Sequence, residues 1–274
     1  MAEDFPGRIS AVTAGNGFVA LSVKRAEQYR AIMAFSLRTG GNSPAPFKSL
    51  NFALKEGDQA ENVRSNQAVF AERLGIDAGR IATCRQVHGD NIEIVETVPE
   101  VLSQADAIVT AIPGIYPAVK TADCLPILLL DPVHRVSAAI HAGWRGTVLR
   151  ISRKVLRTMK SYFGTNPADL LAGLGPAIGP CCYEVDEVVL NPFRQNVPQA
   201  EQFIVKAESE GKCRPSLRLD LVGANRFELI QEGVPPGSIH SAQLCTFCNP
   251  SLFFSYRRDG ACSGRHVAVT GFMS

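Results

Sequence analysis

A cysteine and a histidine that could act together lie at the ends of two neighbouring apolar segments. Cys124 precedes the apolar run 125–130, and His141 follows the apolar run 136–140. Asp131-Pro132 between the runs indicates a turn. If the runs form adjacent antiparallel strands, the start of the first lies beside the end of the second. The thiol of Cys124 and the imidazole of His141 then come within bonding distance, an arrangement suited to metal binding or to nucleophilic chemistry.

His88, in the segment Gln86-Val87-His88-Gly89, could complete a metal site with Cys124 and His141. Three protein ligands leave a fourth position for water, as in catalytic zinc sites, and bound water there can have a pKa of about 7. The residue types alone favour a buried cysteine with two hydrogen-bonded histidines over a zinc site. A competing chemistry uses Cys124 as a nucleophile activated by His141, with Asp123 or another acceptor orienting the imidazole. The two chemistries exclude each other, because a thiolate bound to zinc is a poor nucleophile.

A second group of possible ligands lies near the C-terminus. Cys245 and Cys248, followed by Cys262 and His266, have the residue types and approximate spacing of a structural zinc site. The intervening run 252–254 resembles a core strand, however, so we expect buried thiols here.

Two kinds of anion-binding site can be considered in the sequence, one made by arginines and one by a glycine-rich loop. Arg145 and the pair Arg257-Arg258 could bind a phosphate or carboxylate through paired donors, although a surface ion pair is the ordinary role of a single arginine. The glycine-rich segment 173–180 superficially resembles a phosphate-binding loop. Its two prolines lack amide donors and its spacing is not that of a dinucleotide fingerprint, so no such site is expected.

The elements that must position these residues follow from hydrophobic periodicity and turn signals. Residues 39–46 form a turn-rich loop long enough to carry function. His88 is expected to close a strand over 81–87. Further strands are predicted at 18–24, 31–37, 91–95, 107–112, 116–121, 252–256 and 266–270, and helices at 58–74, 146–163 and 220–232. One α+β domain over residues 1–274 is the simplest arrangement.

Composition limits the classes of partner. The chain has 274 residues, of which 46% are hydrophobic and 20% charged, an ordinary globular balance. The net charge of +2 gives no basis for a nucleic-acid or membrane partner. Residues 1–6 lack the layout of an export signal, and no apolar run approaches the ~20 residues of a membrane span. We therefore expect a cytoplasmic protein whose eight cysteines are thiols, ligands or a nucleophile rather than disulfides.

Several motifs, taken in their order along the chain, resemble those of the YfiH-type family. Its members have been labelled multicopper polyphenol oxidoreductases or laccase-domain proteins and are associated with purine nucleoside phosphorylase activity. The motifs span nearly the whole chain and are distinctive in combination. They are Gly40-Gly41-Asn42-Ser43, Ser49-Leu50-Asn51-Phe52, Gly57-Asp58, Gln86-Val87-His88-Gly89, Thr121-Ala122-Asp123-Cys124-Leu125-Pro126, His141-Ala142-Gly143-Trp144-Arg145-Gly146, Gly175-Pro176-Ala177-Ile178-Gly179 and Phe254-Ser255-Tyr256-Arg257-Arg258.

The resemblance implies a layered α/β/β/α fold with mixed sheets and a zinc ion held by His88, Cys124 and His141. It also implies phosphorolysis of adenosine, inosine, guanosine and methylthioadenosine, and hydrolytic deamination of adenosine. The partners would be purine nucleosides and phosphate. Charge and motif neighbourhood further suggest a catalytic role for Asp123 and substrate contacts by Arg38, Asn51, Arg145 and Arg257.

The laccase label conflicts with the supply of ligands. A multicopper oxidase needs a trinuclear cluster served by many histidines, whereas this chain has five histidines and no His-x-His pair. A site of two histidines and one cysteine could hold one copper ion at most. Zinc is therefore expected in preference to copper.

Two other functions use almost the same residues. A cysteine hydrolase that edits UDP-muramyl precursors of the cell wall could employ Cys124 and His141. A non-catalytic protein could use the three ligands only to hold a loop through a metal. The sequence does not fix the oligomeric state.

Overall fold

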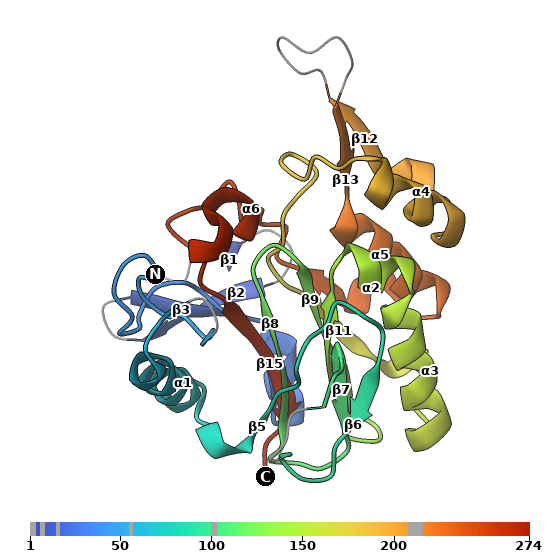
Figure 1. Ribbon diagram of the computed structural model, residues 1–274. Helices are drawn as coiled ribbons and strands as arrows, with labels where there is room; N and C mark the ends of the chain where they lie inside the picture. Colours follow the sequence, from blue (N-terminus) through green and yellow to red (C-terminus); the bar gives the residue numbers. More distant parts are fainter. Residues whose placement is uncertain (1–3, 6–8, 15–16, 55–56, 100–102, 208–215) are drawn as a thin grey trace.

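The computed structural model describes residues 4–5, 9–14, 17–54, 57–99, 103–207 and 216–274. Most of the acidic N-terminal segment on which the expectation of no export signal rests lies outside the described residues. Figure 1 shows two sheets at the centre of the molecule, with α1 on one side and α3 on the other. In the part of the chain that is described, no helix is both long and apolar enough to cross a membrane.

The first sheet has seven strands and mixes antiparallel and parallel pairs. β15 pairs antiparallel with both β4 and β8, so the C-terminal strand is an interior strand of the sheet. In spatial order the strands are β1 (Asp4–Phe5), β2 (Ile9–Ala14), β3 (Gly17–Ser22), β4 (Ala31–Ser36), β15 (His266–Phe272), β8 (Tyr116–Thr121) and β5 (Ile81–Ala82).

The second sheet has six strands and contains the two apolar runs next to the candidate site. β9 and β10 are buried along their whole length, because both faces of this sheet are covered. In spatial order the strands are β14 (Ile239–Ser241), β11 (Leu171–Leu174), β9 (Leu125–Asp131), β10 (Val136–Ala142), β7 (Ala107–Thr110) and β6 (Ile92–Ile94). A separate ribbon of β12 (Ile204–Ala207) and β13 (Ser216–Leu219) projects at the top of Figure 1.

Helices cover the outer faces of the two sheets. Phe70 of α1 packs on the first sheet, and Val155 and Met159 of α3 pack on the second. The helices are α1 (Ala60–Leu74), α2 (Trp144–Val148), α3 (Ile151–Phe163), α4 (Glu187–Asn196), α5 (Leu221–Gln231) and α6 (Tyr256–Asp259). The short 3-10 turns are Lys24–Tyr29, Ala78–Arg80, Pro167–Asp169, Ala200–Phe203, Pro236–Ser238 and Gly260–Cys262.

One large hydrophobic cluster lies between the two sheets. Phe35 and Ala268 of the first sheet contribute to the same buried cluster as Leu128, Leu130 and Ala139 of the second. Because successive strand residues point to opposite faces, Leu129 and Ala138 face the helices instead. The layered α/β/β/α fold with mixed sheets, expected from the family resemblance, is confirmed.

Three predicted elements differ from the structure. The helix expected over 146–163 is two helices, because Arg150 has a left-handed φ of 60° between α2 and α3. The strand expected over 81–87 is limited to β5. No strand forms over 252–256, since the Phe254 amide donates to the ring of His266 and Ser255 caps α6. Six strands and two helices of the described residues were not anticipated: β1, β2, β11, β12, β13, β14, α4 and α6.

Candidate metal centre

The strand pair β9 and β10 places Cys124 beside His141. The strands are antiparallel, with Ala142 opposite Leu125 and His141 opposite Pro126. Cys124 directly precedes β9, so it lies at the end of the sheet where β10 finishes. His141 is buried and Cys124 is half-buried. The antiparallel pairing predicted from the two apolar runs is confirmed.

His88 reaches the same point from a loop, so its expected location at the end of a strand is wrong. Its backbone is left-handed, with φ of 59°. This conformation costs a non-glycine residue about 1–3 kcal/mol, so surrounding bonds must hold it. The ring centroids of His88 and His141 are 4.8 Å apart. The ligand atoms of His88, Cys124 and His141 all lie within 4.8 Å of one another.

Gly143 allows the chain to turn tightly against these side chains. A Cβ atom at this position would lie 3.0 Å from the Cys124 sulfur and 3.5 Å from Cδ2 of His88. The first distance is shorter than ordinary van der Waals contact, so a larger residue would displace the cysteine. Trp144 packs beside a neighbouring hydrophobic cluster, and the Arg145 guanidinium lies 4.3 Å from its ring centroid.

Asp106 is the site residue that the sequence analysis missed. Its buried carboxylate accepts a hydrogen bond from Nδ1 of His141 at 2.7 Å. It also accepts from the backbone amides of Val87 at 3.2 Å, His88 at 3.0 Å and Gly89 at 2.7 Å. One carboxylate therefore orients one candidate ligand and fixes the backbone that presents another. Metal-binding histidines commonly have such a partner on the second nitrogen.

The electrostatics of the pair favour a thiolate beside an imidazolium in the absence of a metal. Burial opposes ionisation of Cys124, but the charge of His141 and hydrogen bonds from both histidines lower its pKa to about 6. Burial also opposes protonation of His141, while the Cys124 thiolate and Asp106 raise its pKa to about 9. A metal cation that displaced the proton of the His141 imidazolium would therefore bind a Cys124 thiol that is already deprotonated.

The donor set suits a transition metal with one open position. A thiolate and two imidazoles are ligands that zinc accepts, and three protein ligands leave room for water or substrate. Because Asp106 occupies Nδ1 of His141, the Nε2 atom is the one that can face a metal. His88 is exposed, which gives the site access to solvent.

Asp123 does not orient His141, contrary to the alternative left open by the sequence. Its carboxylate accepts hydrogen bonds from the Thr246 hydroxyl at 2.5 Å, the Ser255 hydroxyl at 3.1 Å and the Arg257 amide at 2.7 Å. Its φ of 83° is in the left-handed region. Asp123 directly precedes Cys124, and its hydrogen bonds therefore attach the backbone next to this cysteine to Thr246 and to the start of α6.

Arg145 and Arg257 both act electrostatically on Tyr183, as Cys124 does. Both arginines are exposed, and the Arg257 guanidinium lies 5.1 Å from the Tyr183 ring centroid. Its Nη1 donates to the Glu184 carbonyl at 2.8 Å. Burial and the Cys124 charge raise the pKa of Tyr183, while both arginines act in the opposite direction. Tyr183 thus lies within electrostatic reach of Cys124 and of both cations.

Arg38 holds loops together. Its Nε donates to the Lys48 carbonyl at 3.1 Å and its Nη1 to the Pro250 carbonyl at 2.8 Å. The guanidinium also lies 4.7 Å from the Phe254 ring centroid. These contacts connect the loop after β4 to the segment before α6.

Asn51 is fully buried within a similar network. Its Nδ2 donates to the Ala53 carbonyl at 3.0 Å and to Asp58 at 2.8 Å. Its Oδ1 accepts from the amides of Ala53 at 3.0 Å and Arg265 at 2.9 Å. Both donors and both acceptor positions are used, so a substrate contact by Asn51 would require one of these bonds to break.

The zinc site of Cys245 and Cys248 with Cys262 and His266, which the sequence spacing allowed, does not form. The cysteines gather instead with Cys181 and Cys182. His266 is buried at the start of β15, where its Nε2 accepts a hydrogen bond from the Phe254 amide at 2.8 Å.

We expect His266 to make the fold sensitive to acid. Burial lowers its pKa to about 3, against about 6.5 in an unfolded chain. The neutral ring therefore stabilises the fold fully above pH ~6.5, and this contribution is lost as the pH falls towards ~3. In urea titrations between pH 7 and 4.5, a His266→Gln variant should show a shallower decline in unfolding free energy, by up to about 1.4 kcal/mol per pH unit. Equal slopes in the two proteins would contradict this.

Comparison with known proteins places these features in a family. A family model described as multi-copper polyphenol oxidoreductase laccase matches residues 32–273. The chain is 36% identical over 251 residues to purine nucleoside phosphorylase YlmD of Geobacillus stearothermophilus, covering 88% of this chain and 90% of that protein. It is 33% identical over 250 residues to adenosine deaminase RL5 from an unknown prokaryotic organism, covering 88% and 94%.

A solved structure agrees with the sequence comparisons. The crystal structure of Bacillus licheniformis hypothetical protein YfiH superimposes with a TM-score of 0.86 at 33% identity, covering 94% of this chain and 97% of that one. Sequence and fold similarity thus extend over the same, nearly complete length. The chain therefore belongs to the YfiH-type family, which the matching family model describes as multi-copper polyphenol oxidoreductase laccase.

Proposed function

We propose that the protein is a zinc-dependent purine nucleoside phosphorylase that acts on adenosine, inosine, guanosine and methylthioadenosine and also deaminates adenosine. The observation that supports this most directly is the compact group of His88, Cys124 and His141. The exposed Arg145 and Arg257 act on Tyr183 together with Cys124, so cations are available near the group. The relatives named purine nucleoside phosphorylase and adenosine deaminase are consistent with both reactions.

In phosphorolysis, a phosphate oxygen bonds to C1′ of the ribose as the bond from C1′ to the purine nitrogen breaks. The products are the free purine and ribose 1-phosphate, or 5-methylthioribose 1-phosphate when the substrate is methylthioadenosine. A zinc ion held by the three ligands would supply Lewis acidity, and an activated water for deamination. The arginines would hold the phosphate, since guanidinium groups match its oxygens with paired donors. Asp106 would keep the proton on Nδ1 of His141, and Asp123 would fix the backbone of Arg257.

Zinc fits the residues better than the copper of the family description. In the described residues, one group combines histidine and cysteine ligands, and the whole sequence has only five histidines. That supply cannot serve a trinuclear copper cluster beside a separate copper site. We therefore propose that the centre works without redox chemistry.

The function is tested with purified full-length protein of measured metal content, incubated with each nucleoside and phosphate. We expect free purine and sugar 1-phosphate in equal amounts, and no purine when phosphate is omitted. The sugar product is ribose 1-phosphate, or 5-methylthioribose 1-phosphate from methylthioadenosine. Adenosine without phosphate should yield inosine and ammonia. Full zinc occupancy without turnover of any nucleoside would instead favour a non-catalytic metal-binding protein.

The two arginines should control the affinity for phosphate. A charge-assisted hydrogen bond is worth about 1.5–3 kcal/mol, so Arg145→Ala and Arg257→Ala should each raise the KM for phosphate on the order of 10-fold or more. The KM for adenosine should change less, because the substitutions remove cations. Steady-state kinetics with phosphate varied at saturating adenosine measure the effect. Arg194→Ala is the matched control, since this exposed arginine of α4 pairs with Glu187 and Glu201. An unchanged phosphate KM in both site variants would contradict the assignment.

One observation favours a second candidate, a cysteine hydrolase that acts on UDP-muramyl precursors. Cys124 would be the nucleophile and His141, which is hydrogen-bonded to it, would be the base. Asp106 would orient His141 through the hydrogen bond to Nδ1. Hydrolysis of such a precursor by protein from which all metal has been removed, with alkylation of Cys124 abolishing it, would support this function over the first.

A further inference from the structure

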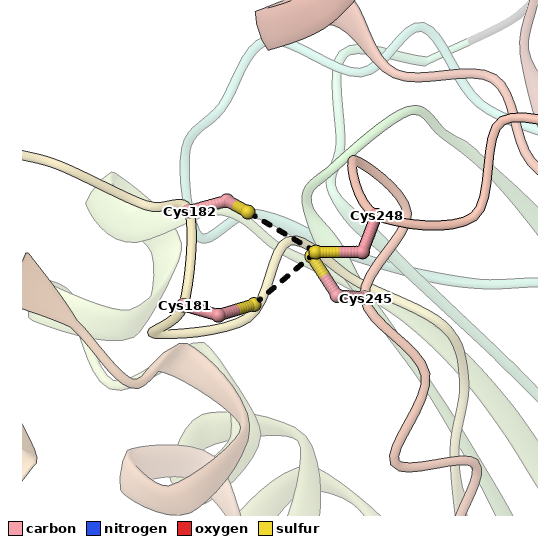
Figure 2. A group of neighbouring side chains, drawn as sticks. All are labelled: Cys181, Cys182, Cys245 and Cys248. Atoms are coloured by element: carbon pink, nitrogen blue, oxygen red, sulfur yellow. Dashed lines mark hydrogen bonds between the residues drawn. The ribbon is translucent and has the colours of Figure 1, made fainter.

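Four cysteines form a second cluster that the proposed nucleoside chemistry does not use. Cys181 and Cys182 lie in the loop after β11, and Cys245 and Cys248 lie in the loop after β14. Their sulfur atoms all lie within 4.8 Å of one another. Figure 2 shows the four side chains pointing toward one another from the two loops.

The fold itself brings these two loops together. β11 and β14 are parallel, with Leu174 opposite Ser241, so both chains leave the sheet in the same direction. The pairing continues beyond the strands: the Ala177 amide donates to the Leu244 carbonyl at 3.3 Å, and the Thr246 amide donates to the Ala177 carbonyl at 3.0 Å. In both loops the cysteines follow within eight residues of the end of the strand.

The separations fit one tetrahedral metal ion. A zinc–sulfur bond of about 2.3 Å puts tetrahedral ligands about 3.8 Å apart. The sulfur of Cys248 lies 3.6 Å from that of Cys181 and 3.2 Å from that of Cys182. A disulfide bond would need about 2.05 Å. In an iron–sulfur cluster the four cysteines are divided among two or four iron atoms, which requires a wider spread of sulfurs.

Burial does not explain the cluster, so the expectation of buried thiols is wrong here. Cys181 and Cys248 are exposed, and Cys182 and Cys245 are only half-buried. Cysteines that serve merely as small apolar residues are normally inside the protein. Four thiols meeting near the surface, from two loops, are arranged for coordination.

Groups around the cluster are of the kind that support metal thiolates. The Gly179 amide donates to the Cys245 sulfur at 3.3 Å, and Nδ2 of Asn249 donates to the Cys245 carbonyl at 2.8 Å. Arg218 donates to the Cys181 carbonyl at 2.5 Å. Four thiolates carry more negative charge than one divalent cation neutralises, and the Arg218 guanidinium brings positive charge to the site.

We propose that Cys181, Cys182, Cys245 and Cys248 bind one structural zinc ion, separate from the centre at His88, Cys124 and His141. Four protein ligands close the coordination sphere, so this ion would have no position for substrate.

The ion would stabilise the backbone next to Cys124 in the first centre. The loop of Cys181 includes Ile178, whose amide donates to the Asp123 carbonyl at 2.9 Å. The loop of Cys245 includes Thr246, whose hydroxyl donates to the Asp123 carboxylate. Both loops are therefore hydrogen-bonded to Asp123, the residue next to Cys124. A metal ion bound by both loops would stabilise the left-handed conformation of Asp123.

Metal counting on the untagged full-length chain, purified under reducing conditions, tests this site separately from the proposed function. Elemental analysis should find two zinc ions per wild-type chain. Cys124→Ala should retain one, and the double variant Cys245→Ser/Cys248→Ser should also retain one. Cys262→Ser is the matched control, because this exposed cysteine is outside the cluster, and it should keep both ions. The double variant, but not the control, should also show a lower Tm.

A spectroscopic measurement covers the case in which the double variant does not fold. X-ray absorption at the zinc edge of Cys124→Ala should show a shell of four sulfurs at about 2.3 Å. Absence of metal from Cys124→Ala would overturn the proposal. So would two zinc ions in a folded double variant, iron with labile sulfide in place of zinc, or a disulfide among the four cysteines when thiols are trapped during lysis.

Discussion

Replacement of Cys124 by alanine is expected to empty the first metal centre and to lower kcat/KM for adenosine phosphorolysis on the order of 10³-fold. The thiolate is the only anionic member of the three candidate ligands, so its loss leaves two imidazoles that hold zinc weakly. Metal-ion catalysis supplies several kcal/mol of transition-state stabilisation, and ~1.4 kcal/mol corresponds to a factor of ten in rate. Metal analysis and release of adenine, measured on the same preparation, test both parts.

The choice of controls separates metal binding from nucleophilic catalysis. Cys262→Ala changes an exposed cysteine away from the centre and should leave kcat/KM unchanged. Loss of activity in Cys124→Ala with full metal retention at the first centre would show that the thiol acts as a nucleophile. Activity retained by wild-type protein after complete metal removal would lead to the same conclusion.

The sequence predicted the strands best where local pattern and tertiary environment agree. The runs that became β9 and β10 are apolar throughout because both faces of the second sheet are covered. Their turn fixes the antiparallel pairing, which brings Cys124 to His141 without further information. β11 and β14 were missed since three or four residues give too short a pattern to distinguish from a loop.

The rest of the site depends on contacts between distant segments. Asp106 stands between alanines and precedes β7, and nothing in this local pattern indicates that its carboxylate will meet the amides of Val87 to Gly89. The approach of the two cysteine loops likewise depends on the parallel pairing of β11 with β14. The adjacent cysteines at 181 and 182 beside a C-x₂-C at 245–248 were the available signal, but sequence spacing alone also allowed Cys262 and His266 as partners.

Asp106→Asn should be the most damaging conservative substitution near the centre. The carboxylate accepts four hydrogen bonds, two on each oxygen, from His141 and from three successive backbone amides. The asparagine side chain keeps one of the two oxygens. In place of the second oxygen it has an NH₂ group, whose N–H donors would face the N–H donors of the protein. Each buried group left unsatisfied costs about 1–3 kcal/mol, so we expect the unfolding free energy to fall by about 2–5 kcal/mol. Loss of the partner that orients a ligand should also weaken zinc binding at the first centre by about 10–100-fold.

Asp90→Asn provides the same chemical change in a nearby carboxylate with a different environment. Asp90 pairs with Lys154, whose side chain is 48% exposed, and exposed ion pairs are worth about 0–1 kcal/mol. Urea unfolding and zinc competition with a chromophoric chelator should therefore separate the two variants clearly. If Asp106→Asn matched Asp90→Asn in both measurements, the carboxylate would not be what holds His88 and His141 in position. If only stability fell, Asp106 would serve the loop backbone alone, because a ligand that kept its orientation would keep its affinity for the metal.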